Sequence, residues 1–206
     1  MSYLLAGALV LASYVIGSVP PAFLVGKWVG GIDIRHHGSG NVGATNVLRT
    51  LGLGPSAAVF GLDFLKGCVP AWVGWQVSGS LLVASLCALA AVCGHNWSVF
   101  LRFSGGKGVT TSLGGVFVLL PLVGAVALSV GLILIAITRY VSFGSLVGAA
   151  LVPIGGVAVV LLGGPPEPLV YCLVAGPMAI YRHRGNIRRL LSGTERKIGR
   201  RVNIER

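Results

Sequence analysis

Two segments of the chain combine glycine with small polar and basic residues, a composition suited to binding phosphate. They read GSGNVGATNVLRTLG (38–52) and GHNWSVFLRFSGGKGVTTSLG (94–114). Glycine lets successive backbone N–H groups point into one concavity, and a helix N-terminus that follows adds partial positive charge. Arg49 and Lys107 would add full positive charges. We therefore predict that the two segments form one receptacle for phosphorylated reactants.

Neither segment matches a nucleotide-binding fingerprint. A GxGxxG pattern begins at Gly38, and Asp63 follows at a suitable distance, but that motif needs a preceding strand within a βαβ unit. In the second segment Leu101 stands where a P-loop has its first glycine, and Gly108 stands where it has Ser or Thr. We predict neither a dinucleotide site nor a Walker A site.

The residues of conventional acyl-transfer and hydrolytic sites lack the required spacing. A His-x4-Asp box is excluded because Phe100 stands five positions after His95, and no GxSxG elbow occurs. With only five Asp and Glu in the chain, a paired-carboxylate mechanism is hard to assemble. The Cys and His residues lack metal-ligand spacing. The expectation is a site without metal or cofactor.

The composition places these segments in a membrane protein. Hydrophobic residues make up 54% of the 206 positions and charged residues 10%, and the mean hydropathy is +0.87. Runs with few or no charges recur, and several reach the roughly 20 residues that a helix needs to cross a bilayer. They cover residues 3–26, 55–77, 81–100, 108–138, 141–166 and 168–181.

The basic residues predict how the chain crosses the membrane. Nine of the sixteen Lys and Arg lie in a tail over 182–206, and positive residues favour the cytoplasmic side. All basic loops share that side if the run 108–138 is divided at the helix-breaking Pro121. We predict an all-α polytopic integral membrane protein with about seven transmembrane helices, N-terminus outside, C-terminus cytoplasmic.

Two further expectations concern charge. Asp63 and Lys66 lie three positions apart in one membrane run, and such a pair on one helix face is expected to be a structural ion pair that supports the loops. The basic tail is interpreted as an anchor on anionic lipid rather than a nucleic-acid contact. Residues 1–206 are expected to form a single membrane-embedded domain.

The polar segments resemble those of a known family. The two glycine-rich segments, DFLKG (63–67) and YRHRGNIRRLL (181–191) are similar, in the same order, to signature segments of the bacterial acyl-phosphate-dependent glycerol-3-phosphate acyltransferases, the PlsY family. The resemblance implies transfer of a fatty acyl group from acyl phosphate to glycerol 3-phosphate, which yields 1-acylglycerol 3-phosphate (lysophosphatidic acid) and phosphate. It further implies a multi-pass enzyme of the bacterial cytoplasmic membrane with its active site facing the cytosol, and neither acyl-CoA nor acyl carrier protein as donor.

The resemblance also implies roles for individual residues. Ser39, Arg49, Lys107 and Asn186 are expected to be catalytic, with Lys107 and the backbone of Gly105 and Gly106 holding the acyl-phosphate phosphoryl group. The other expected substrate- or phosphate-binding residues are Gly38, Gly40, Asn41, Gly43, Thr45, Asn46, His95, Ser142, Arg182 and His183.

For some of these residues a structural role fits the sequence equally well. Asn41, Thr45 and Asn46 could cap local turns. Ser142 could be a helix N-cap, and His95 a buried structural histidine.

The chemistry fits the residue types. Acyl phosphate is an activated mixed anhydride, so the protein needs mainly to bind two phosphates, align a hydroxyl and stabilise negative charge. In the family picture a phosphate oxygen takes the hydroxyl proton. The expected partners are acyl phosphate, glycerol 3-phosphate, membrane lipid and, transiently, the soluble enzyme that makes acyl phosphate; nucleic acid is not expected.

The alternative function is a membrane carrier or channel for an anionic phosphate metabolite. A carrier needs polar residues along both halves of its pathway. In this sequence, Glu167 is the one charged residue of the predicted external turns. The sequence therefore favours the enzyme.

Overall fold

The computed structural model describes residues 2–199, and the regular secondary structure of these residues is entirely helical. Residues 200–206 of the predicted basic tail lie outside the described residues. The α-helices are α1 (Tyr3–Ser18), α2 (Pro21–Gly30), α3 (Ala44–Thr50), α4 (Leu53–Ser78), α5 (Leu81–Asn96), α6 (Val109–Leu119), α7 (Pro121–Thr138), α8 (Val141–Leu161), α9 (Leu169–Arg182) and α10 (Arg184–Leu191). Short 3-10 helices cover Ile34–His36 and Val99–Leu101.

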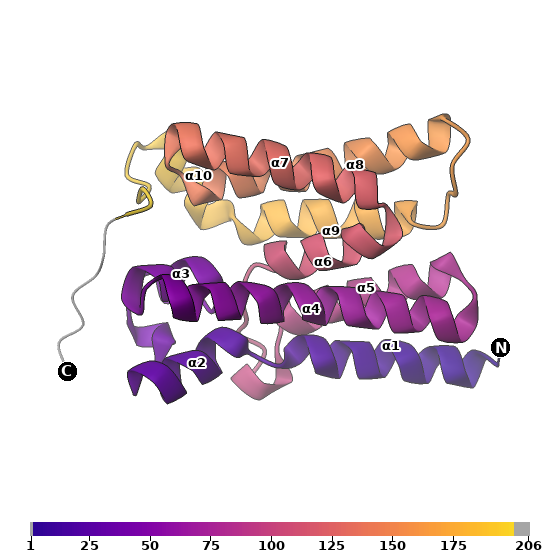
Figure 1. The fold of residues 1–206 in the computed structure, drawn as a ribbon, viewed down its shortest axis with the longest axis horizontal. Coiled ribbons are helices and arrows are strands. Elements are labelled where there is room, and N and C mark those ends of the chain that lie inside the picture. Colours follow the sequence, from indigo (N-terminus) through magenta and orange to yellow (C-terminus); the bar gives the residue numbers. More distant parts are fainter. Residues whose placement is uncertain (1, 200–206) are drawn as a thin grey trace.

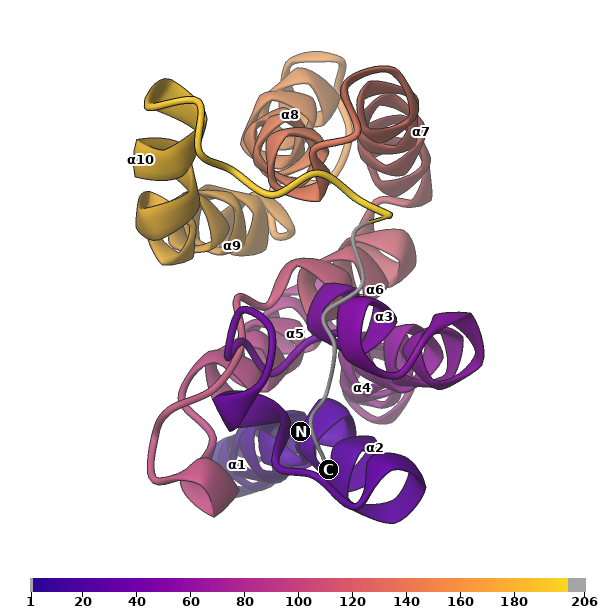
Figure 2. The ribbon, with the colours of Figure 1, turned by 90° about the vertical axis from the view of Figure 1, so that its left-hand side faces the viewer.

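The helices form two groups that meet at α6. Figure 2 shows α1 to α6 in one group and α7 to α10 in the other. Small residues allow close approach inside the first group, because a Cβ at Gly17 would clash with the backbone of Ala91, and one at Gly67 with the backbone of Thr111. Such small-residue contacts are typical of helix packing in lipid.

The apolar helices agree with the predicted membrane class. Five segments of the described residues are long and apolar enough to span a membrane, and α6 and α9 are shorter apolar helices. Large apolar side chains lie on the surface, including Leu122, Ile137 and Leu162, which are 77%, 74% and 87% exposed. Lipid is the solvent in which such a surface is stable. The number of crossings and the side on which each terminus lies stay predictions.

Prolines set two breaks in the helices, and the sequence analysis found one of them. The predicted break at Pro121 is confirmed, since α6 ends at Leu119 and Pro121 is the first residue of α7, where its missing N–H is tolerated. The first run, 3–26, was expected to be one span, and one candidate span covers Tyr3–Gly30. It divides at Val19 and Pro20 into α1 and α2 because Pro21 begins a new helix.

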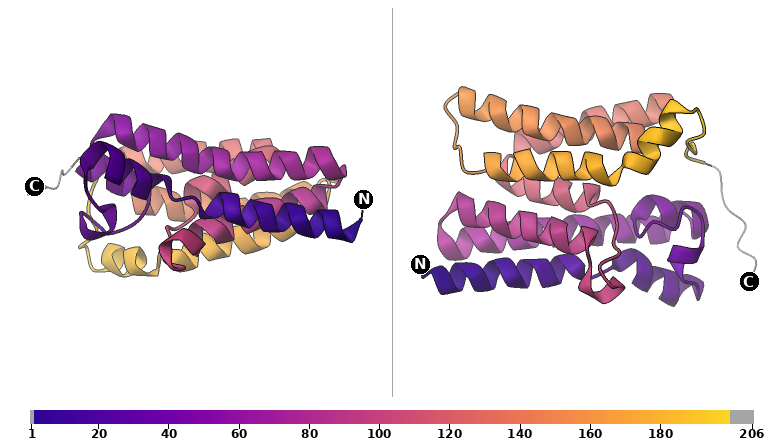
Figure 3. Two further views of the ribbon diagram at one scale, coloured as in Figure 1. Left: turned by 90° about the horizontal axis from the view of Figure 1, so that it is seen from below. Right: turned by 180° about the vertical axis from the view of Figure 1, so that it is seen from behind.

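The two ends of the molecule differ in their chemistry. The N-terminus, the turn between α4 and α5 and the loop between α8 and α9 lie at one end, while α3 and α10 lie at the other (Figures 1 and 3). The end with α3 and α10 also carries the polar loop before α3 and the chain that follows α10. The elements expected to bind phosphate therefore lie together.

Candidate functional site

One cavity of about 990 Å³ is lined by both glycine-rich segments and by helices of both groups. This volume is in the range of small-molecule sites. Its polar walls come from residues 38–46, Arg49, residues 104–105 and 107–110, and the chain around α10. Its apolar walls include Leu128, Leu132, Ile135, Gly148 and Val152 on α7 and α8. The structure thus places the two segments around one space, as the sequence predicts.

The first loop is organised by the side chain of Asn46. Its Oδ1 accepts a hydrogen bond from the backbone N–H of Ser39 at 2.8 Å, and its Nδ2 donates to the carbonyl oxygens of Ile34 and His37 at 3.1 and 3.0 Å. The residue is 1% exposed. Its polar atoms hold the loop together, which fits the turn-capping alternative. Asn46 also lines the cavity, and substrate binding by it stays a prediction.

The glycines of this loop permit its turns. Gly38 and Gly40 have φ angles of +64° and +70°, which glycine adopts without the strain of a side chain. Gly43 is the N-cap of α3. Their contribution is to loop shape, and it leaves side chains of the same segment facing the cavity.

Several polar side chains of the first segment remain available to bind a substrate. Ser39, Asn41 and Thr45 line the cavity, and their side chains form no hydrogen bond with any described residue. Arg49 also lines it, is 9% exposed, and donates from Nη2 to the carbonyl oxygen of Arg196 at 3.1 Å. Burial lowers the pKa of Arg49 from its usual value. Substrate binding by these four residues stays a prediction.

The second loop is held by its neighbours rather than by its own side chains. The backbone N–H groups of Gly105 and Gly106 donate to the carbonyl oxygens of Asn96 and His95 at 3.1 and 3.0 Å. We therefore correct the expectation that these two amides bind phosphate, because both are already paired with the end of α5. The backbone N–H groups of residues 107–110 have no acceptor among the described residues, and these residues line the cavity at the start of α6.

Arg182 contacts the carbonyl groups of the second loop. Its guanidinium donates to the carbonyl oxygens of Gly105 and Gly106 at 2.7 to 3.0 Å, and it lies 5.7 Å from the ring centroid of Trp97. Five N–H donors in a rigid fork suit such a contact. Arg182 thus holds the second loop to α9. It also lines the cavity, and phosphate binding by it stays a prediction.

Lys107 lies beside Asn186, as the predicted site requires. Its Nζ donates to Asn186 Oδ1. Burial lowers the pKa of Lys107 to about 8, against which the negative charge of Glu195 acts to raise it. At pH 7 the Lys107 side chain is still largely protonated and can bind an anion.

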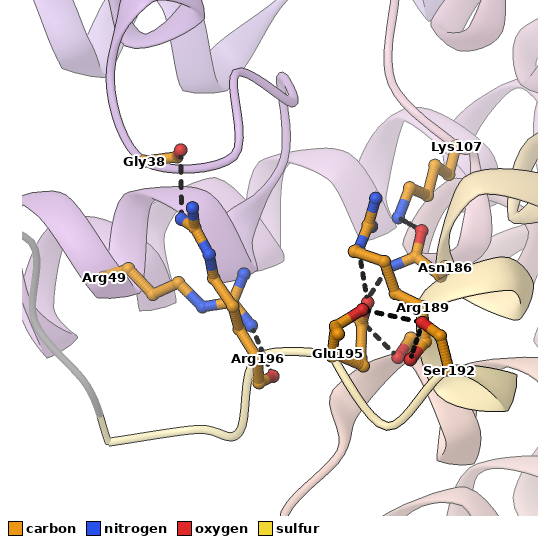
Figure 4. Close-up of polar contacts among 10 residues, drawn as sticks. Gly38, Arg49, Lys107, Asn186, Arg189, Ser192, Glu195 and Arg196 are labelled. Carbon is orange, nitrogen blue, oxygen red and sulfur yellow. Dashed lines mark hydrogen bonds and ion pairs between the residues drawn. The ribbon is translucent and has the colours of Figure 1, made fainter.

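Glu195 joins the residues around Asn186, and the sequence analysis did not select it. It accepts from Ser142 Oγ at 2.8 Å, from Asn186 Nδ2 at 2.6 Å and from Arg189 Nε at 2.7 Å. Figure 4 shows it beside Asn186 and Arg189. Ser142 is not a helix N-cap, because Tyr140 is the N-cap of α8. The available signal was that Glu195 is one of only two acids in a strongly basic tail.

The two site histidines are buried. His183 is 3% exposed, and its Nδ1 lies 2.8 Å from the carbonyl oxygen of Ala179. Burial, followed by the charge of Lys107, lowers the pKa of His183 to about 4, so the ring is neutral. Since a carbonyl only accepts, Nδ1 carries the proton and Nε2 is left as an acceptor. His183 lines the cavity.

The predicted ion pair lies directly behind the second loop. Lys66 Nζ is 2.9 Å from Asp63 Oδ1 and donates to the carbonyl oxygen of Val19 at 2.8 Å, so the pair is confirmed. His95 Nδ1 lies 3.3 Å from the same carboxylate oxygen. A Cβ at Gly106 would clash with the His95 ring, so the imidazole supports the loop from beneath. His95 also lines the cavity.

The fold and the site together define a class of protein. A helical membrane protein whose cavity is cationic at one end and apolar at the other fits a protein that handles phosphorylated lipid or its precursors. The described residues hold no group of three His, Cys, Asp or Glu that could bind a metal.

Comparison with known proteins specifies the class. The family model for glycerol-3-phosphate acyltransferase matches residues 7–193. The glycerol-3-phosphate acyltransferase of Thermoanaerobacter sp. is 43% identical over 199 residues, covering 95% of this chain and 96% of the relative. Glycerol-3-phosphate acyltransferase 2 of Moorella thermoacetica is 47% identical over 194 residues, covering 94% and 97%. The chain belongs to the glycerol-3-phosphate acyltransferase family.

Two solved structures have the same fold. The glycerol 3-phosphate form of PlsY, an integral membrane glycerol 3-phosphate acyltransferase, matches with a TM-score of 0.87 and 41% identity, covering 94% of this chain and 96% of that one. Its lysophosphatidic acid form matches with a TM-score of 0.84 and 41% identity, covering 95% and 96%. The family resemblance recognised in the sequence is confirmed.

Proposed function

We propose that this glycerol-3-phosphate acyltransferase takes its acyl group from acyl phosphate and forms 1-acylglycerol 3-phosphate. One observation carries the proposal: a single cavity joins Arg49 and Lys107 to an apolar groove along α7 and α8. Acyl phosphate has this polarity, with a dianionic head and an apolar chain. Acyl-CoA, a thioester that carries a nucleotide, would need a further polar surface beyond the phosphate-binding end of the cavity.

The reaction needs little from the protein besides binding and alignment. The primary hydroxyl of glycerol 3-phosphate attacks the carbonyl carbon of acyl phosphate, the bond between that carbon and the bridging oxygen breaks, and phosphate leaves. The hydroxyl proton passes to a phosphate oxygen, so no protein base is required. Proximity of bound reactants and stabilisation of the developing oxyanion supply most of the acceleration in such reactions.

The site residues fit these tasks. Lys107 and the unpaired N–H groups at the start of α6 would hold one phosphate, and Arg49 with Ser39 the other. Neutral His183 presents an acceptor nitrogen on which the glycerol hydroxyl could align. Arg182 would act indirectly, through its hydrogen bonds to Gly105 and Gly106.

The placement in the cell is part of the proposal. The cluster of basic residues near the cavity supports a cytosolic mouth in the bacterial cytoplasmic membrane, where soluble glycerol 3-phosphate and the enzyme that makes acyl phosphate are present. We further propose that residues 1–206 act as one membrane-embedded domain. Labelling of a cysteine at exposed Thr194 by an impermeant reagent, from inside-out but not right-side-out vesicles, would support this orientation; the reverse would overturn it.

The activity is tested with purified protein in lipid or detergent. Acyl phosphate and glycerol 3-phosphate should give phosphate and lysophosphatidic acid in equal amounts, while acyl-CoA and acyl carrier protein thioesters give none. Absence of product beside an active family enzyme would overturn the donor assignment. The carrier alternative predicts uptake of labelled glycerol 3-phosphate into vesicles without acylation.

A further inference from the structure

The chain after α10 crosses the site and brings an acid to its centre. We define residues 193–198 as the C-terminal segment. We propose that Glu195 of this segment is a positioning residue that orients the amide of Asn186 toward Lys107; this inference rests on the proposed function of Lys107 as a phosphate-binding residue.

The carboxylate of Glu195 is buried, and both of its oxygens accept hydrogen bonds. Its side chain is 5% exposed. Oε1 accepts from Ser142 Oγ at 2.8 Å and from Asn186 Nδ2 at 2.6 Å, while Oε2 accepts from Arg189 Nε at 2.7 Å. The partners come from α8 and from two positions of α10, so one carboxylate fixes the junction of three chain segments (Figure 4).

The direction of the Asn186 amide follows from this contact. A carboxylate only accepts hydrogen bonds, so the end of the amide that faces Glu195 must be the donor end, Nδ2. The acceptor end, Oδ1, is then turned to the ammonium of Lys107, which donates to it. Rotation of the amide by half a turn would place N–H groups against the ammonium. Glu195 therefore favours the one orientation in which Asn186 holds Lys107.

The C-terminal segment is itself held from both sides of the cavity. Arg49 donates to the carbonyl oxygen of Arg196 at 3.1 Å, and Arg196 Nη1 donates to that of Gly38 at 3.2 Å. On the other side, the backbone N–H of Ile198 donates to the carbonyl oxygen of Arg139 at 2.8 Å, and Arg139 Nη2 donates back to Ile198 at 3.2 Å. In Figure 2 this part of the chain runs across the end of the α7 to α10 group. Glu195 is thus anchored at its place.

Loss of the Glu195 charge should be measurable through the pKa of Lys107, because charged groups surround its ammonium. The positive groups that face Lys107 lower its pKa, and they come from α3, α9 and α10 in the form of Arg49, Arg182 and Arg189. Glu195 is the carboxylate that raises it. Asp63 of α4 also lines the cavity, but it is paired with Lys66 and His95, and His183 is neutral. Loss of the Glu195 charge should therefore let Lys107 lose its proton at lower pH.

The experiment compares Glu195→Ala and Glu195→Gln with the wild type in the acyl-phosphate assay. Charged hydrogen bonds of this kind are worth about 1.5–3 kcal/mol, so Glu195→Ala should lower kcat/KM by about 10- to 150-fold, mainly through a higher KM for acyl phosphate. Glu195→Gln keeps an acceptor oxygen for Asn186 and should lose less. In both variants the alkaline limb of the pH profile should move to lower pH.

Thr194→Ala is the matched control. Thr194 is exposed in the same segment, and its Oγ1 contacts only the Ser192 hydroxyl among the described residues. Its activity and pH profile should equal those of the wild type. An equally large loss in Thr194→Ala would mean that the segment acts by its folding alone and would overturn the proposal.

A double mutant tests whether Glu195 acts through Asn186. If it does, then at a pH low enough to keep Lys107 protonated in every variant, Glu195→Ala combined with Asn186→Ala should be no less active than Asn186→Ala alone. Multiplied losses, or an alkaline limb unmoved in Glu195→Gln, would overturn the proposal. Glu195→Gln carries the test if Glu195→Ala does not fold. A wild type inactive with acyl phosphate would instead refute the proposed function.

Discussion

The two glycine-rich segments look alike in sequence but are held in shape by opposite means. The first loop is fixed from within, because Asn46 binds three main-chain groups that lie 7 to 12 positions before it. The second is fixed from outside, since its amides pair with the end of α5 and its carbonyls with Arg182 of α9. The shape of the first loop therefore depends on residues close in sequence, whereas the shape of the second depends on the packing of remote helices.

The difference indicates which changes each loop tolerates. Damage to the first loop should act through local stability, while damage to the second should transmit any shift of α5 or α9 to Lys107. Both loops nevertheless deliver one cation to the same cavity, Arg49 from the first and Lys107 from the second. Variants can therefore separate the shape of each loop from its charge.

Removal of either cation should have the largest effect. Lys107→Ala and Arg49→Ala each delete a positive charge at a cavity where two phosphates are expected, and loss of one such stabilising group commonly costs about 100- to 1,000-fold in turnover. We expect kcat/KM to fall to this extent with helical content and thermal stability retained. Wild-type rates in either variant would show that its loop does not bind substrate.

Gly106→Ala should break the second loop without touching its charge. A Cβ there would lie 2.8 Å from the carbonyl oxygen of Val42 and would overlap the His95 ring. Because the loop cannot move away without leaving Arg182, we expect about a 100-fold loss of kcat/KM, comparable to misplacing a catalytic group by about 1 Å. Gly61→Ala is the control, since open space surrounds that position on α4, and it should behave as wild type. An active Gly106→Ala enzyme would show that the loop is not rigid.

The sequence predicted the elements of the fold better than the contacts within the site. Hydropathy located the apolar helices and charge distribution located the Pro121 break, because both are local or additive properties of the chain. The break at Pro20 was missed although its two prolines were visible, since an uncharged run was treated as one helix. The contacts of Glu195 with Ser142 and Asn186 join residues 53 and 9 positions apart, and no periodicity records such a contact.

The site residues whose polar groups are paired within the protein share one physical feature. Amides and guanidinium groups bind phosphate, carbonyls and carboxylates alike, so their presence in a glycine-rich segment does not say which partner they have. Asn46 and Arg182 are satisfied by the protein's own backbone, and so are the amides of Gly105 and Gly106. Ser39, on the loop that Asn46 holds, and Arg49, on α3 after it, line the cavity as expected.

Asn46→Ala should break the first loop and act mainly on stability. The substitution removes three hydrogen bonds, from the N–H of Ser39 and to the carbonyl oxygens of Ile34 and His37, and a hydrogen bond of this kind is worth about 0.5–1.5 kcal/mol. We expect a clear fall in thermal unfolding temperature, with activity lost in parallel on warming. Asn41→Ala in the same loop removes a side chain without described hydrogen bonds and should leave stability unchanged. Equal stability of the two variants would contradict the structural role of Asn46.

Arg182→Lys should produce the smallest effect and is the sharpest test of how the second loop is held. The variant keeps the positive charge near the cavity but replaces a planar fork, which reaches two carbonyl oxygens at once, with one ammonium on a flexible stem. If Arg182 bound phosphate by charge, lysine would largely preserve activity. If it positions Gly105 and Gly106, we expect about a 10-fold loss of kcat/KM, in line with about 1.4 kcal/mol for a missing hydrogen bond. Arg102→Lys, an exposed substitution elsewhere in the same segment, should have no effect, so a loss confined to Arg182→Lys would assign the cost to geometry rather than to charge.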